Sequence, residues 1–271
     1  MYRSYFDDET KRKLESIKGI MFEIRIRLGR KIIVYTNNGE TVLDIIADGS
    51  YINNLFKRVM SNSVYALKKE IEKGYITIED GSRVGFCGRC VIENGEIINI
   101  TDVNAINFRV ANDFSVCNDE LLEKIKGNTL IIGPPGCGKT TLLRDIARKI
   151  SKEKNVSVVD ERGELFPVYN QKTVFDVKGK CDIMTGCEKS KGVEMVIRTM
   201  NPKLVVFDEI QPEKELACVK NAVNSGVEII TTVHGRDIKD VREKIREVYS
   251  IFDTALIMSD EKEVKEIVCL N

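Results

Sequence analysis

No stretch of this 271-residue sequence approaches the roughly 18 consecutive apolar residues that a membrane-spanning helix requires. The N-terminal segment, MYRSYFDDETKRKLES, is polar and charged, and it is not followed by the apolar segment of a secretory signal. Lysine and arginine number 42, and aspartate and glutamate also number 42, so the net charge is zero. We therefore expect neither a membrane span nor a secretory signal, and bulk charge gives no argument for nucleic-acid binding.

The sequence also lacks internal repeats and low-complexity segments, and its 42% apolar and 31% charged residues are typical of a globular protein. Its eight cysteines are scattered, so in a reducing compartment we expect free and mostly buried thiols. The pair Cys87 and Cys90 has redox or half-zinc spacing. Both residues are expected on one strand, on opposite faces, without further ligands nearby. We therefore expect no metal or redox site at these cysteines.

The first 116 residues predict a small α+β domain. Ile20–Gly29 alternates in the manner of a strand, with Glu23, Arg25 and Arg27 on one face and Ile24, Ile26 and Leu28 on the other. The other expected elements are a hairpin turning at Asn37-Asn38-Gly39, a helix over Tyr51–Lys73 that ends at Gly74, and strands joined at Asp80-Gly81 and Asn94-Gly95.

Residues 117–271 alternate strand and helix, which indicates a parallel sheet with crossover helices. A short helix is expected over Asp119–Lys126, in the stretch that joins the domains. The apolar runs that predict strands are Thr129–Ile132, Val156–Val159, Leu204–Phe207 and Val227–Val233, and the C-terminal sequence TALIMSDEKEVKEIVCL predicts an antiparallel hairpin. The fold class is therefore α/β, preceded by the small α+β domain.

The sequence GPPGCGKT, Gly133–Thr140, satisfies the phosphate-loop (Walker A) pattern G-x-x-x-x-G-K-[ST], with a strand before it and a helix after it. Glycines let backbone N–H groups turn toward phosphates, and the helix N-terminus adds partial positive charge. We expect Lys139 to bind the β- and γ-phosphates and the Thr140 hydroxyl to coordinate Mg²⁺. The expected ATP-binding residues are Gly133, Pro134, Pro135, Gly136, Cys137, Gly138, Lys139, Thr140 and Thr141.

Two acids follow the strand in NPKLVVFDEI. Asp208 is placed to hold Mg²⁺, directly or through water, and Glu209 to polarise the attacking water. An acid directly after the Mg²⁺-linked one favours the ATPase branch of the P-loop fold, which has an added central strand. A guanine-specifying Asn-Lys-x-Asp is also absent. The sequence therefore predicts an Mg²⁺-dependent ATPase with a RecA-like core.

The single histidine, His234, ends a later apolar strand after Thr231 and Thr232. Ligands of such sheets bind at the carboxyl ends of the strands, where the phosphate loop also lies, so His234 is a candidate sensor of the γ-phosphate.

The segment VSVVDERGEL ends another expected strand with two acids and an arginine. We expect Asp160 or Glu161 to position water or Mg²⁺, and Arg162 to contact phosphate or a neighbouring subunit.

These motifs together resemble the secretion ATPase superfamily, the hexameric motors of type II and type IV secretion and of pilus assembly. GPPGCGKTT, DERGEL, IRTMNPKLVVFDEI and TTVHG occur in the order of that superfamily. Two departures are Asp208-Glu209, where the superfamily often has Gly-Glu, and the absence of the tetracysteine module of some type II members.

The segments EIRIRLGR, GYITIEDGSRVGFCGR, INFRVA and VDERGEL resemble a sporulation branch of the superfamily over nearly the whole chain. This resemblance implies an ATPase ring, of six subunits by analogy, that drives or assembles a channel complex between mother cell and forespore. It also implies an integral-membrane platform protein as partner, and a place in the mother-cell cytoplasm at the membrane.

A ring of this kind requires an arginine from outside the phosphate loop to stabilise charge on the departing γ-phosphate. Arg109 aligns with an arginine near the end of the superfamily's N-terminal domain, and Arg198 precedes the acid-bearing strand, so we expect it beside the active site. Further candidates are Arg25, Arg27, Arg30, Arg83 and Arg89.

Two other functions stay open. Some plastid and cyanobacterial relatives of this architecture carry a single-stranded nucleic-acid-binding module. This sequence shows no basic patch interleaved with aromatic residues, and its zero net charge argues against nucleic acid as a partner. The remaining alternative is a scaffold that binds ATP with little turnover.

Overall fold

The computed structural model describes residues 2–61 and 74–270, and the chain divides into two compact units. The N-terminal unit contains Met1–Asn112 with Tyr169–Val174, and the C-terminal unit contains Asp113–Val168 with Phe175–Asn271. The division thus follows Asn112, whereas the sequence predicts a boundary after residue 116.

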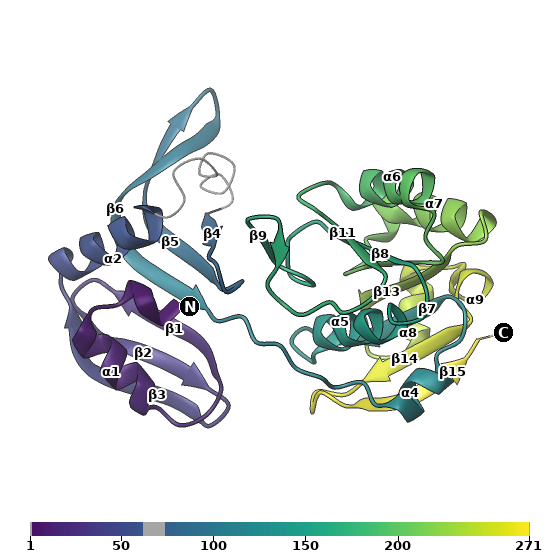
Figure 1. Cartoon of the computed structure of the whole chain (residues 1–271), viewed down its shortest axis with the longest axis horizontal. Helices are drawn as coiled ribbons and strands as arrows, with labels where there is room; N and C mark the ends of the chain where they lie inside the picture. Colours follow the sequence, from purple (N-terminus) through teal and green to yellow (C-terminus); the bar gives the residue numbers. More distant parts are fainter. Residues whose placement is uncertain (1, 62–73, 271) are drawn as a thin grey trace. The chain divides into compact units, whose positions relative to one another are not determined.

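Antiparallel pairing builds the sheet of the N-terminal unit, whose six strands have the order β3-β2-β1-β6-β5-β4 (Figure 1). The elements are η1 (Tyr2–Tyr5), α1 (Asp8–Ser16), β1 (Met21–Arg27), β2 (Arg30–Thr36), β3 (Gly39–Ala47), α2 (Gly49–Ser61), β4 (Tyr75–Thr77), β5 (Arg83–Glu93) and β6 (Glu96–Arg109). The expected strands and hairpins are confirmed. Helix α2 is described as far as Ser61, and the rest of the helix predicted over Tyr51–Lys73 lies outside the described residues.

The alternating pattern of β1 produces the core of this unit. Ile24 and Ile26 are fully buried, and Phe6 packs on Phe108 with the ring centroids 4.8 Å apart. Leu28, expected on the same apolar face, is 50% exposed because β1 ends at Arg27 and the chain turns there. The predicted assignment of faces is therefore confirmed within β1 and wrong for Leu28, which follows the end of the strand.

The C-terminal unit is built on a seven-stranded sheet of order β11-β8-β12-β13-β7-β14-β15. All neighbouring strands are parallel except β14 and β15. Its elements are α4 (Asp119–Lys124), β7 (Thr129–Gly133), α5 (Lys139–Ile150), β8 (Val156–Asp160), β11 (Cys181–Thr185), α6 (Lys189–Met200), β12 (Leu204–Phe207), α7 (Pro212–Asn224), β13 (Glu228–His234), α8 (Ile238–Lys244), α9 (Val248–Ile251), β14 (Thr254–Met258) and β15 (Val264–Cys269). A separate short pair consists of β9 (Val168–Tyr169) and β10 (Lys172–Thr173).

The sheet confirms the predicted branch of the P-loop fold, because β13 lies between the phosphate-loop strand β7 and the acid-bearing strand β12. Strands β7, β8, β12 and β14 are buried along their whole length, as expected for parallel strands that are covered on both faces. The sequence did not predict β11, whose residues CDIMT lack an apolar run. This strand forms at the edge of the sheet by parallel pairing with β8.

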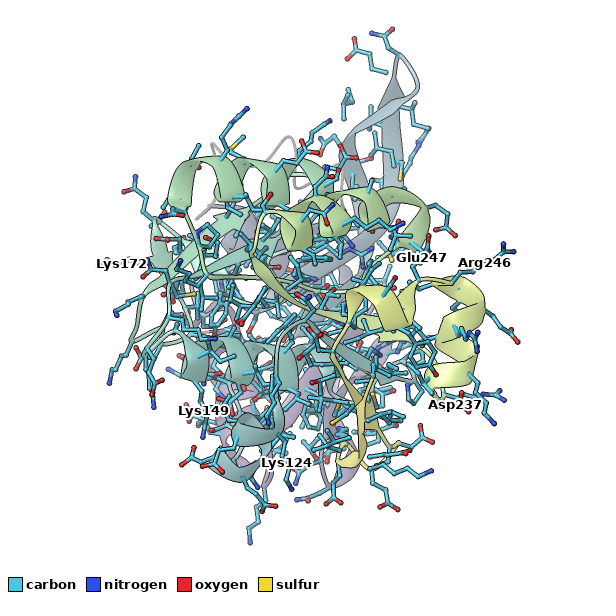
Figure 2. All side chains as sticks on the ribbon, turned by 90° about the vertical axis from the view of Figure 1, so that its right-hand side faces the viewer. Lys124, Lys149, Lys172, Asp237, Arg246 and Glu247 are labelled. Carbon is cyan, nitrogen blue, oxygen red and sulfur yellow. The ribbon has the colours of Figure 1, made fainter. Side chains whose placement is uncertain are left out.

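Charged side chains of both signs lie on the surface of the C-terminal unit, among them Lys124, Asp237, Arg246 and Glu247 (Figure 2). Within residues 2–61 and 74–270, no helix is both long enough and apolar enough to cross a bilayer.

All eight cysteines are free, and the expectation of mostly buried thiols is wrong for several of them: Cys87, Cys90 and Cys269 are exposed. A bulge in β5 falls between Cys87 and Arg89, so the simple alternation that we assumed for Cys87 and Cys90 is interrupted. Burial raises the pKa of Cys117 and Cys218 to about 11 and that of Cys181 to about 12. These three thiols are therefore protonated and weakly nucleophilic at neutral pH.

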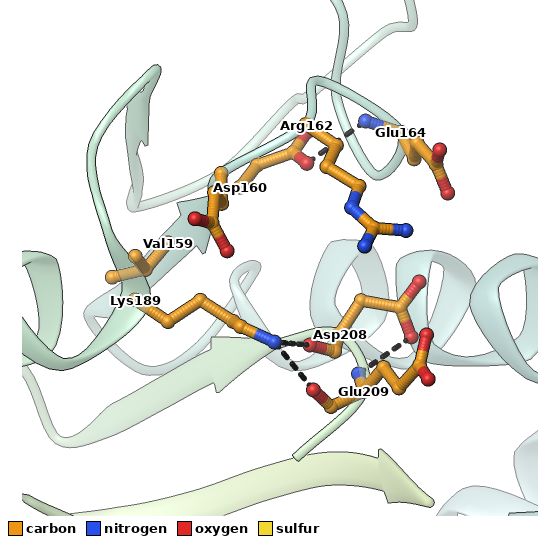
Figure 3. Close-up of a pocket in the computed structure, with 8 residues that line it drawn as sticks. Val159, Asp160, Arg162, Glu164, Lys189, Asp208 and Glu209 are labelled. Carbon is orange, nitrogen blue, oxygen red and sulfur yellow. Dashed lines mark hydrogen bonds between the residues drawn. The ribbon is translucent and has the colours of Figure 1, made fainter. Parts of the chain in front are cut away.

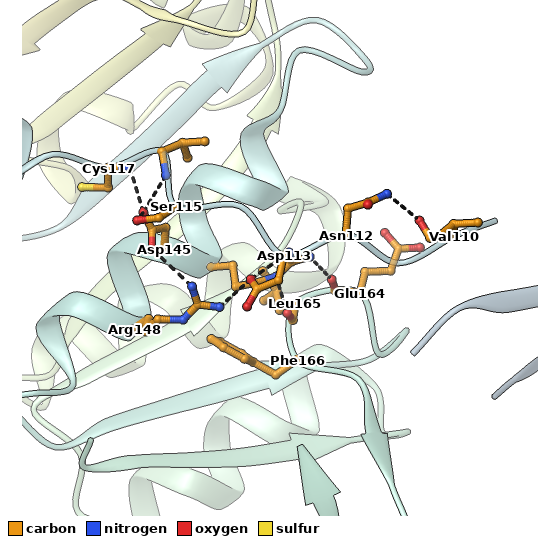
Figure 4. Close-up of polar contacts among 12 residues, drawn as sticks. Val110, Asn112, Asp113, Ser115, Cys117, Asp145, Arg148, Glu164, Leu165 and Phe166 are labelled. Carbon is orange, nitrogen blue, oxygen red and sulfur yellow. Dashed lines mark hydrogen bonds and ion pairs between the residues drawn. The ribbon is translucent and has the colours of Figure 1, made fainter. Parts of the chain in front are cut away.

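The start of the C-terminal unit is fastened to α5 by Asp145, which is 1% exposed. Its Oδ2 accepts hydrogen bonds from the Ser115 hydroxyl at 3.0 Å and from the backbone N–H groups of Val116 and Cys117, both at 2.8 Å (Figure 4). Arg148, one turn along α5, donates to Asp113 at 2.6 Å. The segment that leads into this unit is thus attached to the helix that follows the phosphate loop.

We expect Asp145→Ala to lower the free energy of unfolding by about 3 kcal/mol, because it leaves three donors without their buried acceptor. Urea denaturation followed by circular dichroism measures this loss. Asp119→Ala is the control, since that carboxylate is 90% exposed and pairs with Lys149 at the surface. Equal destabilisation by the two substitutions would contradict the role given to Asp145.

Candidate active site

The phosphate loop connects the end of β7 to the start of α5. Gly136 and Gly138 have φ angles of +78° and +91°, in the left-handed region that favours glycine. A Cβ atom on Gly133 would lie 2.5 Å from the Cys137 sulfur, so this position also requires glycine. The sequence therefore forms a tight loop that ends at the N-terminus of α5, a favourable site for a phosphate anion.

Lys139, the first residue of α5, is 6% exposed, and its ammonium group connects the loop to the neighbouring strand. Its Nζ donates to the carbonyl oxygens of Gly133 at 2.9 Å and Pro134 at 2.8 Å, and lies 3.1 Å from His234 Nδ1. An ammonium group has donors only, so Nδ1 must accept, and a neutral ring then carries its proton on Nε2. Nε2 lies 3.2 Å from Glu209 Oε1. His234 therefore links the phosphate-loop lysine to Glu209.

Asp208 joins the same loop to the ends of β12 and β13. Its Oδ2 accepts from the Thr140 hydroxyl at 2.7 Å, and its Oδ1 accepts from the Thr232 hydroxyl at 2.7 Å and from Glu209 N–H at 3.0 Å. The Thr140 and Asp208 oxygens are hard donors close together, and Mg²⁺ typically takes one or two protein oxygens and completes its shell with water and phosphate. The two residues predicted as Mg²⁺ ligands thus fit that ion.

Glu209 has an unusual backbone, with a φ angle of +45°. A non-glycine residue in this region costs about 1 kcal/mol or more and is found mainly where surrounding contacts hold it. Its N–H also donates to the Thr232 hydroxyl at 3.0 Å, and its carbonyl accepts from Lys189 at 2.5 Å. The side chain is 40% exposed and faces His234. These contacts fix the direction of the carboxylate.

A small pocket adjoins the acid pair (Figure 3). With a volume of about 30 Å³, it has room for a water molecule or two beside these carboxylates. It is lined by Val159, Asp160, Glu161, Arg162, Glu164, Lys189, Asp208 and Glu209. Glu161 and Arg162, two of the residues predicted from DERGEL, therefore line the same pocket as Glu209.

Asp160 shapes the DERGEL turn. It is 3% exposed, and its carboxylate accepts from the N–H groups of Glu164 at 2.8 Å and of Leu165 and Phe166, both at 2.9 Å. Three backbone bonds occupy the carboxylate, so the observed contacts of Asp160 order the loop that carries Glu161 and Arg162.

The structure does not bring Arg198 to this edge of the sheet. Arg198 lies in the last turn of α6, while Lys189 at the first turn contacts the end of β12. A residue that precedes a strand lies at the strand's amino end, whereas the phosphate loop lies at the carboxyl ends. Arg109 belongs to the N-terminal unit, where it is exposed at the end of β6 and pairs in register with Glu23.

The other arginine candidates belong to the N-terminal unit as well. Arg25 donates to Glu23 at 2.7 Å, and Arg83 stacks over the Tyr75 ring at 4.8 Å. The remaining members of the set are Arg27, Arg30 and Arg89. Sequence reasoning did not identify Lys189, since a lysine in the polar stretch CEKSKG gives no signal of burial.

The sheet order and the loop at its carboxyl edge define a P-loop ATPase fold with an added central strand, preceded by an α+β unit. Two solved structures share this fold at low identity. The ATPase DotB of Yersinia pseudotuberculosis aligns with a TM-score of 0.63 and 17% identity over 93% of this chain and 75% of its own. The pilus retraction motor PilT with bound ADP aligns with a TM-score of 0.61 and 14% identity over 91% of this chain and 76% of its own.

Residues 8–270 match the family described as sporulation stage III, protein AA, and the chain belongs to this family. Stage III sporulation protein AA of Bacillus subtilis (strain 168) is 33% identical over 232 residues, which cover 82% of this chain and 76% of that protein. The predicted membership of a sporulation branch is thereby confirmed.

Proposed function

We propose that the protein is an Mg²⁺-dependent ATPase of the sporulation stage III AA family, which works as an oligomer on a membrane channel complex. The observation that carries the proposal is the convergence of Lys139, Thr140, Asp208, Glu209 and His234 at one edge of the sheet. Lys139, Thr140, Asp208 and Glu209 supply the phosphate-binding, metal-binding and basic groups of ATP hydrolysis, and His234 links two of them.

The phosphates of ATP bind at the loop Gly133–Gly138 and the N-terminus of α5, with Lys139 at the β- and γ-phosphates. Thr140 and Asp208 would hold Mg²⁺, and the bound ion would neutralise part of the negative charge of the phosphates. Glu209 accepts a proton from the attacking water as that water approaches the γ-phosphate.

His234 places a neutral N–H group against the Glu209 carboxylate and a lone pair against Lys139. It thereby couples the position of the base to that of the phosphate-binding lysine. Glu161 and Arg162, which line the adjoining pocket, are proposed to orient water and to contact phosphate or a neighbouring subunit.

Stabilisation of the departing γ-phosphate is completed by an arginine from a neighbouring copy, for which Arg109 and Arg198 are the candidates. The oligomer is a hexamer in this proposal. It acts in the mother-cell cytoplasm on an integral-membrane platform protein of the sporulation channel. Family membership and the likeness of the fold to DotB and PilT support these assignments.

Phosphate release from ATP by the purified chain tests the proposed activity. We expect steady turnover with Mg²⁺ in excess, loss of at least about 100-fold in rate when EDTA removes the metal, and recovery when Mg²⁺ is restored. Turnover that is unchanged in EDTA would contradict the metal assignment. Tight ATP binding without phosphate release would instead favour the scaffold function.

A further inference from the structure

A buried lysine outside the phosphate loop contacts the backbone of the proposed catalytic base. Lys189, the first residue of α6, is 7% exposed. Its Nζ donates to the carbonyl oxygen of Glu209 at 2.5 Å and to that of Asp208 at 3.4 Å, as Figure 3 shows.

This placement of a lysine is unfavourable for helix stability. The N-terminus of a helix carries partial positive charge, so a cation in the first turn opposes the helix dipole. Burial of an ammonium group is also costly unless its donors are satisfied. Neither helix stability nor burial therefore favours a lysine at position 189. Its hydrogen bonds to the two carbonyl groups do favour it.

A buried carboxylate completes the arrangement from the other side. Glu215 in the first turns of α7 is 2% exposed, and its Oε1 lies 3.8 Å from Lys189 Nζ. Its Oε2 accepts from Gln211 N–H at 2.5 Å. Lys189 and Glu215 together thus hold the chain at residues 208, 209 and 211, on both sides of the Glu209 peptide.

The backbone of Glu209 requires such support, because its φ angle of +45° is disfavoured for a residue with a side chain. Asp208 and Thr232 hold the N–H of Glu209, and Lys189 holds its carbonyl. With both peptide groups fixed, the carboxylate is directed toward His234. The N–H of the same peptide group, from Ile210, donates to the Thr232 carbonyl at 2.8 Å. Loss of the Lys189 contact would therefore weaken the restraint on this peptide and let the carboxylate deviate from its direction toward His234.

We propose that Lys189, paired with Glu215, is a positioning residue that holds Glu209 in its left-handed conformation and so orients the catalytic base. This inference rests on the proposed ATPase function. Lys189 acts through Glu209, so its removal should affect the rate of hydrolysis and leave the binding of ATP at the phosphate loop unchanged.

The test compares Lys189→Met, which keeps the apolar stem, with Lys189→Arg, which keeps the donor, and with Lys191→Met as control. Lys191 lies in the same turn of α6 but is exposed and pairs with Glu188. We expect Lys189→Met to lower kcat about 100-fold with the Kd for Mg-ATP within about twofold of wild type. Lys189→Arg should recover most of the rate, and Lys191→Met should match wild type.

A double variant that combines Lys189→Met with Glu209→Gln distinguishes an effect on the position of Glu209 from a general disturbance of the structure. If Lys189 acts through Glu209, the double variant Lys189→Met/Glu209→Gln is no slower than Glu209→Gln alone. Multiplied losses, or a loss of ATP affinity equal to the loss of rate, would overturn the proposal. If Lys189→Met does not fold, Glu215→Gln gives the same comparison, because the glutamine keeps the size and can still accept from Gln211 N–H.

Different results would contradict the role of Lys189 and the proposed ATPase function. A wild-type chain that does not hydrolyse Mg-ATP overturns both. A wild-type chain that hydrolyses ATP, together with a Lys189→Met variant of equal kcat, overturns the role of Lys189 alone.

Discussion

Glu209→Gln is expected to lower the turnover of ATP by about 10²- to 10⁴-fold while the affinity for Mg-ATP stays near that of wild type. Glutamine keeps the length of the side chain and can still accept a hydrogen bond from His234 Nε2, which lies 3.2 Å from Oε1 in the wild type. It cannot accept a proton from water at neutral pH. The substitution therefore removes the proposed base and leaves the phosphate loop intact.

Phosphate release and equilibrium binding of a fluorescent ATP analogue measure the two quantities separately. Glu213→Gln is the matched control, because Glu213 follows closely in the chain and is exposed in the first turn of α7. It should behave as wild type in both measurements. Equal turnover by Glu209→Gln and wild type would show that another group accepts the proton.

Lys139→Ala is expected to weaken Mg-ATP binding by at least about 100-fold and to abolish turnover. The ammonium group donates to two carbonyl oxygens of the loop, those of Gly133 and Pro134. Its loss removes the charge that binds the β- and γ-phosphates. It also removes the contact of 3.1 Å between Nζ and His234 Nδ1.

Lys149→Ala supplies the control for this variant, because Lys149 lies on the same helix and pairs with Asp119 at the surface. Isothermal titration with Mg-ATP gives the affinities, and a thermal melt verifies that both variants fold. Retention of wild-type affinity by Lys139→Ala would refute the location of the phosphate site.

The places of the phosphate loop and of the acid pair in the fold could be predicted from the sequence, because both depend on local patterns. Gly138 of the motif and Gly136 within the loop both have positive φ angles, and Asp208 directly follows a fully buried apolar strand. The placement of His234 followed from a general rule, since the carboxyl ends of parallel strands share one edge. Its register opposite Gly133 agrees with that rule.

Interactions between segments distant in sequence could not be predicted in the same way. Strand β11 depends on pairing with β8 and has no apolar run of its own. The position of Asp160 in DERGEL suggests a catalytic acid, whereas in the structure its carboxylate accepts three hydrogen bonds from backbone N–H groups of the same turn. The sequence suggests that Lys189 and Glu215 are surface charges, because both are charged residues in polar stretches. In the structure both are buried where α6 and α7 pack.

The expectation that Arg198 lies beside the active site of its own chain is wrong, because it took the wrong end of the strand. The sequence places it a few residues before the acid-bearing strand, and nearness in sequence suggested nearness to the site. A β-strand rises about 3.3 Å per residue, so the strand itself separates the residues before it from those after it. Arg198 therefore lies at the end of α6 away from the Lys189 contact to Glu209.

Single-turnover hydrolysis of radiolabelled ATP by an excess of wild-type protein with Mg²⁺ tests the central claim most directly, because it follows bound nucleotide at one site. The account predicts that bound ATP is converted to ADP and phosphate in the wild type and stays intact on Glu209→Gln. Bound ATP that remains uncleaved on both proteins would contradict the claim that these strand ends form a hydrolytic centre, and equal cleavage by both would contradict the assignment of Glu209 as its base.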